Sequence, residues 1–265
     1  MTSWLDTCRL CVADIRGVLV HLPTRAEREP VLRLGEGGDE TTAIDQAAED
    51  AVVARLGARD EDFVLVSEEL GQRAFGTGGE VRVVVDPIDG SVNAKRGIPF
   101  FSFSLAVADG PTMGDVTFGY VYDFGSGEEW TANRGGGAFL GGEHIGAVRP
   151  KETIEILSFE GTTASTIADR IGGVLGLVGR VRVMGSLALS LCHLADGRVD
   201  AVCSLKPARS VDIAAAQLLV RECGLAIELF EGPPFERAPL DLTMRSRVAA
   251  AGSPELVAEL AAALR

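Results

Sequence analysis

The sequence predicts an α/β fold in which a first half of α+β character precedes a half of alternating strands and helices. In the first half, β-branched and apolar runs such as residues 81–85 and 101–108 are typical of strands joined by glycine- and proline-containing turns. After about residue 150, the predicted order is strand, helix, strand, helix and strand, which favours a layered unit. The 265 residues, 46% of them hydrophobic, can bury a large core. Because no long linker separates the halves, we predict two closely packed domains, residues 1–150 and 151–265.

Two amphipathic helices are predicted near the N-terminus. Residues 3–20 place apolar side chains every three or four positions, and residues 43–57 repeat this pattern up to Gly57. On the second helix Asp45 and Glu49 lie four residues apart, so their carboxylates share a face and are either well solvated or held near a cation.

The cysteines indicate reduced thiols. Cys8 and Cys11 form a C-x-x-C pair with no second pair and no histidine at a ligand spacing, so we expect them on a buried helical face. The odd total of five cysteines and the lack of an export signal favour a cytoplasmic protein. No apolar run reaches the roughly 18 residues of a membrane span, so no membrane association is expected.

The net charge of −13 argues against a nucleic-acid groove, because binding to a phosphate backbone needs clustered lysine and arginine. An acidic protein can still bind a small anion if metal ions supply the positive charge.

The segment VVVDPIDGSVN, residues 83–93, places two carboxylates three residues apart at the end of an apolar run. We expect the strand to end at Asp86, because Pro87 cannot donate to a ladder and turns the chain so that Asp89 points into the same space. Two carboxylates this close require a proton or a cation, and Mg²⁺ prefers such oxygen ligands. A D-x-x-D-G turn is also a common surface loop, which is the alternative for this segment taken alone.

Further carboxylates occupy comparable positions. Glu68 and Glu69 end the preceding strand, and the ends of neighbouring strands in one sheet lie together. Asp212 directly precedes the apolar part of a helix, where a carboxylate either caps the N-terminus or faces a metal.

Several ordered motifs resemble those of the inositol monophosphatase family of Mg²⁺-dependent, lithium-sensitive phosphatases. They are GDETTAIDQAAE, VSEELG, VVVDPIDGSVNAKRGIPFF, GEEWTANRGGGAFLGG, GSLALSLCHLADGRVDAV and SVDIAAAQLLVRECG, and they span nearly the whole chain. The archaeal branch with combined inositol monophosphatase and fructose-1,6-bisphosphatase activity is the most similar. The resemblance implies a layered αβαβα sandwich, two or three Mg²⁺ ions and a homodimer.

The resemblance also implies a role for each matching residue. The metal ligands would be Glu68, Asp86, the carbonyl of Ile88, Asp89 and Asp212. The catalytic group would comprise Asp45 and Ser91, which orient the attacking water, with Glu68, Glu69 and Glu49 around them. The substrate would be contacted by the N–H groups of Gly90 and Ser91 at its phosphate and by Gly185 and Ser186 at its organic part.

The chain departs from the family pattern at three places. Ser91 replaces a threonine, Val211 replaces a tryptophan, and no glutamate near Ser204 corresponds to the residue that contacts inositol. Lys206 and Arg209 stand there instead, and they either bind a second phosphate or form surface and helix-end pairs.

The resulting hypothesis is a Mg²⁺-dependent phosphomonoesterase that hydrolyses inositol monophosphate, with fructose 1,6-bisphosphate as a second substrate, by metal-activated water. The alternatives are histidinol phosphate or 3′-phosphoadenosine 5′-phosphate as substrate, or a regulatory binding protein on the same fold. No nucleophile motif or histidine ligand pattern is present in the sequence. Residues 34–41, which are rich in glycine, are the candidate lid.

Overall fold

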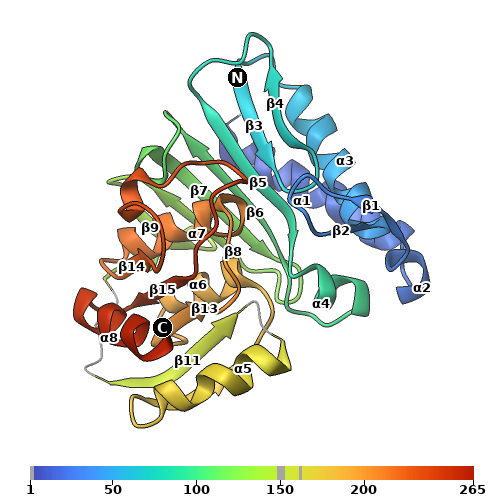
Figure 1. The fold of residues 1–265 in the computed structure, drawn as a ribbon. Coiled ribbons are helices and arrows are strands. Elements are labelled where there is room, and N and C mark those ends of the chain that lie inside the picture. The colour runs from blue at the N-terminus through green and yellow to red at the C-terminus, as the bar shows by residue number, and fades with distance from the viewer. Residues whose placement is uncertain (1–2, 148–152, 161–162) are drawn as a thin grey trace.

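The computed structural model describes residues 3–147, 153–160 and 163–265, and these residues form five layers. Two long helices cover one face of a large sheet, two further helices separate that sheet from a smaller one, and the last layer covers the outer face of the smaller sheet (Figure 1). The predicted αβαβα sandwich is therefore confirmed. In layer order the principal helices are α1 (Trp4–His21), α3 (Ala43–Gly57), α6 (Leu187–Ala195), α7 (Ser210–Glu222), α5 (Ala164–Arg170) and α8 (Pro254–Leu264).

The larger sheet has eight strands in the order β10-β9-β8-β7-β6-β5-β3-β4. Among the pairs described, β3 and β5 run parallel and the other neighbours antiparallel, so these two strands end at the same edge. Its strands are β3 (Phe63–Ser67), β4 (Gly71–Phe75), β5 (Arg82–Asp89), β6 (Ser102–Ala108), β7 (Val116–Asp123), β8 (Glu129–Asn133), β9 (Gly137–Leu140) and β10 (Glu143–His144).

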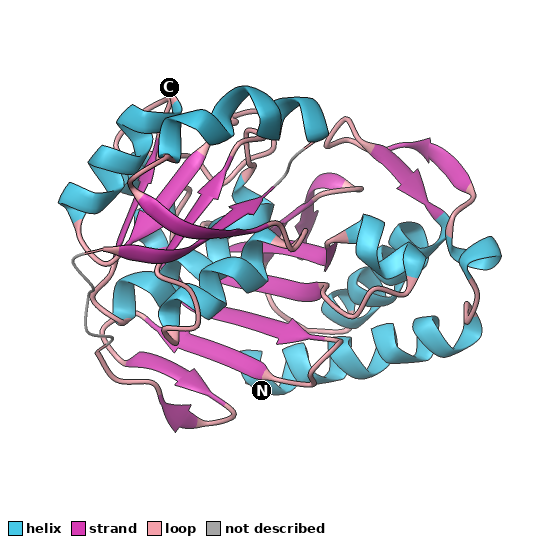
Figure 2. Cartoon of the chain, turned by 90° about the horizontal axis from the view of Figure 1, so that it is seen from below, coloured by secondary structure: helices cyan, strands magenta, loops and turns pink. Residues whose placement is uncertain are grey.

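The smaller sheet has five strands in the order β12-β11-β13-β15-β14. β12, β11 and β13 are parallel, whereas β15 runs antiparallel to both of its neighbours, β13 and β14, so the sheet is mixed. Figure 2 shows the strands of both sheets with helices packed against them. Its strands are β11 (Ile154–Glu160), β12 (Val178–Arg182), β13 (Ala201–Ser204), β14 (Ala226–Leu229) and β15 (Val248–Ala251).

Three apolar clusters fill the spaces between the layers. One joins α1 and α3 to the larger sheet, a second surrounds α6 and α7 between the sheets, and a third lies on the outer face of the smaller sheet. Side chains from both halves of the chain share the middle cluster, so the two predicted domains are joined by a common interior. Cys8 and Cys11 lie on the buried face of α1 as predicted, and all five cysteines are buried and free. None of the described helices has the length and apolar character needed to span a membrane.

Two local predictions were wrong. Residues 34–42, expected as a glycine-rich loop, belong instead to a two-stranded hairpin of β1 (Val31–Leu34) and β2 (Glu40–Thr42), which follows the short helix α2 (Arg25–Arg28). β5 does not end at Asp86 but continues to Asp89, with a register shift between the two carboxylates. An irregularity of this kind accommodates a proline that lacks an N–H, so the ladder with β6 resumes beyond Pro87.

Gly119 tests how closely α7 packs on the larger sheet. A Cβ at Gly119 on β7 would lie 2.5 Å from the carbonyl oxygen of Ala215 on α7. We expect Gly119→Ala to destabilise the protein by about 2 kcal/mol, because the helix backbone must shift away from the sheet. The measurement is the melting temperature.

The matched control is Gly17→Ala within α1, where an added Cβ meets no atom within 4 Å. We expect this substitution to stabilise by about 0.5–1 kcal/mol, because alanine loses less backbone entropy on folding. Equal melting temperatures for the two variants would contradict the proposed close approach.

Candidate active site

A cavity of about 350 Å³ opens where β3 and β5 end and α7 begins. Among the described residues, carboxylates outnumber cationic side chains in its lining, so the cavity attracts cations before anions. The carboxylates are Asp39, Glu40, Asp45, Glu68, Glu69, Asp86, Asp89 and Asp212, and the cations are Lys95, Lys206 and Arg209.

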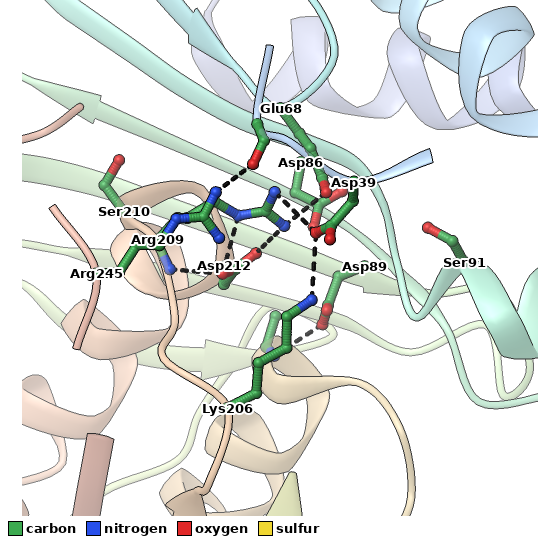
Figure 3. A network of polar contacts seen from close by, with 12 residues as sticks. Asp39, Glu68, Asp86, Asp89, Ser91, Lys206, Arg209, Ser210, Asp212 and Arg245 are labelled. Atoms are coloured by element: carbon green, nitrogen blue, oxygen red, sulfur yellow. Dashed lines mark hydrogen bonds and ion pairs between the residues drawn. The ribbon is translucent and has the colours of Figure 1, made fainter. Parts of the chain in front are cut away.

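Three carboxylates form the centre of the site. One oxygen from each of Glu68, Asp86 and Asp212 lies within 4.8 Å of the others (Figure 3). The parallel pairing of Ser67 with Val85 brings the first two together, as the sequence predicted. Asp212 was predicted either to cap the helix or to face a metal, and it does the first while lying where the second is possible. Its Oδ2 accepts the N–H of Arg209 at 2.6 Å as a helix cap, and its side chain belongs to the carboxylate cluster.

The Asp86–Asp89 segment folds back on itself. Asp86 Oδ1 accepts the N–H of Ile88 at 3.0 Å, and the Ser91 hydroxyl donates to the Ile88 carbonyl at 3.0 Å. Gly90 then adopts a φ of +95°, and a Cβ there would lie 3.0 Å from the Gly185 carbonyl. The short helix α4 (Ser91–Arg96) begins immediately after it, at the edge of the cavity.

Asp89 is fixed by the start of α6. Its Oδ2 accepts the N–H of Ala188 at 2.8 Å and the hydroxyl of Ser186. Ser186 was expected beside the substrate, but its side chain is buried and does not line the cavity, whereas Gly185 does. The reason is that Ser186 caps α6, so its hydroxyl faces Asp89 and the helix.

Asp45 and Glu49 are both buried, so the solvated alternative for this pair was wrong. Asp45 Oδ2 accepts the Thr42 hydroxyl at 2.6 Å and the Thr42 N–H at 3.0 Å, which leaves Oδ1 without a partner among the described residues. Glu49 accepts the Ser67 hydroxyl at 2.8 Å through Oε2, and burial raises its pKa to about 7.

Glu69 links the site to the β1–β2 hairpin. Its Oε2 accepts the hydroxyl of Thr41, and burial raises its pKa. The backbone of the hairpin turn also bonds to the end of β3, because the Gly37 N–H donates to the Glu68 carbonyl at 2.9 Å.

The two basic residues in the SLKPARSVD segment differ in their surroundings. Arg209 is almost fully buried and contacts Glu68, Asp212 and Asp39, so the helix-end pairing considered for it is present. Lys206 is 52% exposed and pairs with Asp39 at 3.2 Å. Of the two, Lys206 is the one free to meet a ligand in the cavity.

Burial and mutual repulsion raise the pKa values of Glu68, Asp86 and Asp89. Burial is the main cause for Glu68, whose pKa rises to about 8, and for Asp89, whose pKa rises to about 7. The pKa of Asp86 is raised well above its usual value by burial, and then by Glu68 and Asp89. A bound cation relieves this strain, and an all-oxygen donor set beside the unpartnered Asp45 Oδ1 suits a hard divalent ion such as Mg²⁺.

Four contributing residues were missed from the sequence. Thr42, which orients Asp45, was available as a T-x-x-D capping signal. Asp39, Lys95 and Glu160 had no local signal. Glu160 is buried on β11 and accepts the N–H of Gly185 at 2.7 Å, so it holds the loop before α6.

Comparisons with known proteins identify the family of the chain. The family model described as "Inositol monophosphatase family" matches residues 20–265. A protein of Methanothermobacter thermautotrophicus named fructose-1,6-bisphosphatase/inositol-1-monophosphatase is 32% identical over 262 residues, covering 91% of this chain and 93% of the relative. A Salmonella typhimurium protein named Nus factor SuhB is 33% identical over 200 residues, covering 73% of each chain.

Solved structures are similar over the full length. A structure described as an inositol monophosphatase-fructose 1,6-bisphosphatase gives a TM-score of 0.85 at 28% identity and covers 99% of this chain and 100% of its own. The extragenic suppressor protein SuhB of Bartonella henselae gives a TM-score of 0.79 at 26% identity, covering 100% of this chain and 99% of its own.

Asp86→Asn tests the electrostatic strain of the site. The folded-state pKa of Asp86 is raised, so ionising Asp86 destabilises the metal-free protein. This destabilisation is absent at low pH, where Asp86 is protonated, and grows as the pH rises. In EDTA at pH 8 we expect the variant to melt about 3 °C above the wild type, and by a smaller margin at pH 5.

Added Mg²⁺ should raise the melting temperature of the wild type and have much less effect on Asp86→Asn. Asp60→Asn, at an exposed position, is the control for the loss of one carboxylate and should behave like the wild type. If metal-free Asp86→Asn melts below the wild type at pH 8, then ionised Asp86 does not destabilise the metal-free site.

Proposed function

The chain belongs to the inositol monophosphatase family and is a phosphatase, and from this premise we propose that it hydrolyses phosphomonoesters with Mg²⁺ as its cofactor. The observation that carries the proposal is the cluster of Glu68, Asp86 and Asp212 beside Asp45, whose Oδ1 is buried and unpartnered in the described structure. This arrangement supports a cation site next to an oxygen that has no hydrogen-bond partner in the described structure.

Five ligands would hold two or three metal ions: Glu68, Asp86, the Ile88 carbonyl, Asp89 and Asp212. When bound, Mg²⁺ supplies positive charge to the phosphoryl oxygens and the leaving oxygen and makes the attacking water more acidic.

Asp45 is proposed to orient the attacking water and take its proton. Thr42 donates two hydrogen bonds to one carboxylate oxygen of Asp45, a residue of the cavity lining, which fixes the rotamer and leaves the other oxygen without a partner among the described residues. The Ser91 hydroxyl donates to the Ile88 carbonyl here, so it can still accept a hydrogen bond from the attacking water.

The phosphate is proposed to lie against the Gly90 and Ser91 N–H groups. The first N–H groups of a helix lack intrahelical partners, and the left-handed Gly90 turns the chain so that α4 starts at the cavity wall. The organic part of the substrate would extend toward Gly185, with Glu160 holding that loop.

Inositol monophosphate and fructose 1,6-bisphosphate are the proposed substrates, following the names of relatives such as the Methanothermobacter protein. The exposed Lys206 supports a bisphosphate, because its ammonium group lies in the cavity lining near only one carboxylate, Asp39, among its described partners. Arg209 is a weaker candidate for the second phosphate, since three carboxylates already surround it.

A regulatory binding role is the second candidate, favoured by the match to a relative named Nus factor SuhB. The variant Asp86→Asn distinguishes the two functions. Hydrolysis must be lost with this carboxylate, whereas binding of a protein partner that survives the substitution would support regulation. We also propose that the protein forms the homodimer that the family resemblance implies.

Asp45→Asn should separate catalysis from metal binding. We expect Mg²⁺-dependent phosphate release from inositol 1-phosphate to fall by about 100- to 10,000-fold, because the amide cannot accept the proton of water. Mg²⁺ affinity, measured by calorimetry, should change little. Asp60→Asn is again the control, and full activity of Asp45→Asn would remove Asp45 from the mechanism.

Lys206→Ala should identify the substrate class. We expect the KM for fructose 1,6-bisphosphate to rise about tenfold while the KM for inositol 1-phosphate stays within twofold, because one charge-assisted contact is lost to the second phosphate alone. Steady-state kinetics on both substrates measure this. Equal effects on both would show that Lys206 does not contact a second phosphate.

A further inference from the structure

Arg209 lies inside the carboxylate cluster. Its side chain is only 6% exposed, and Nη2 lies 2.5 Å from Glu68 Oε1 and 3.2 Å from Asp212 Oδ1. A single nitrogen of the guanidinium therefore bridges two of the three carboxylates that define the proposed metal site (Figure 3).

That nitrogen contacts carboxylate oxygens that a cation would need as ligands. Mg²⁺ takes carboxylate oxygens as ligands, so an ion held by Glu68 or by Asp212 would compete with Nη2 for them. Two cations in one buried space repel each other strongly, because the surroundings screen charge far less than water does.

Resting on the proposed function, we propose that Arg209 is a positioning residue that serves as the counter-ion of the metal-free site. An incoming divalent cation displaces Nη2 from between Glu68 and Asp212. One residue thus keeps the carboxylates together before the metal arrives and lowers the affinity with which the metal binds.

The β1–β2 hairpin provides a second attachment for the guanidinium. Nη1 lies 3.3 Å from Asp39 Oδ2 and is buried without a hydrogen bond in the described structure. A Cβ at Gly37 would lie 2.5 Å from Nη1, so the hairpin turn packs directly against this group. Asp39 can keep the guanidinium nearby when the bridge to the carboxylates is broken.

The test is the binding of Mg²⁺ alone, by calorimetry, to full-length protein stripped with EDTA and dialysed. We expect Arg209→Gln to bind Mg²⁺ about tenfold more tightly than the wild type, because a competing charge is removed. Arg134→Gln is the matched control, since it deletes one arginine charge from an exposed pair with Asp109 and should bind like the wild type.

Thermal unfolding gives an independent readout. Without metal, Arg209→Gln should melt about 4 °C or more below the wild type, because the carboxylates lose their counter-ion. In saturating Mg²⁺ the two proteins should melt within about 1 °C of each other. A purely structural arginine would instead lower both melting temperatures and weaken Mg²⁺ binding.

Each outcome has a definite consequence. Equal or weaker Mg²⁺ binding by Arg209→Gln, with the wild type binding normally, overturns the inference and leaves the proposed function intact. A wild type that takes up no divalent cation overturns both. If Arg209→Gln does not fold without metal, Arg209→Met replaces it: the side chain fills the buried space without a charge, so tighter Mg²⁺ binding is again expected and equal or weaker binding overturns the inference.

Discussion

Repulsion between buried and half-buried carboxylates is the constraint around which this molecule is arranged. Glu68, Asp86 and Asp212 converge within 4.8 Å, and burial raises the pKa of Glu68 to about 8. Charges of one sign do not gather in a protein interior unless the surrounding structure holds them there. Two rigid strands and a helix do so here, and Arg209 offsets part of the charge.

The layered fold explains how such rigidity is obtained. β3 and β5 are parallel neighbours, so their carboxylates leave the larger sheet at one edge, while α7 lies in the middle layer and brings Asp212 to the same edge. Close packing supports this placement, because Gly119 allows α7 to approach β7 directly. The geometry of the site is therefore a property of backbone packing between layers more than of any single loop.

The central carboxylates could be predicted because each adjoins a recognisable apolar run. Glu68 directly follows β3, Asp86 lies in β5 just before its register shift, and Asp212 lies in the first turn of α7. Ser186 and Glu160 could not be assigned, because their roles depend on how the second half docks against Asp89 and Gly185. The hairpin over residues 31–42 was missed since it pairs only two short strands with exposed apolar side chains, which leaves little periodic signal.

The central position of α7 also bears on how the chain is made. Synthesis proceeds from the N-terminus, so the larger sheet is complete in sequence well before the helix that covers its inner face. Until then Val84, Ala106 and Val121, buried in the finished molecule, lack the partners that α7 provides. A nascent or truncated chain that stops before residue 210 exposes an apolar sheet face and is prone to aggregate, and its metal site cannot be completed until the last quarter of the polypeptide has emerged.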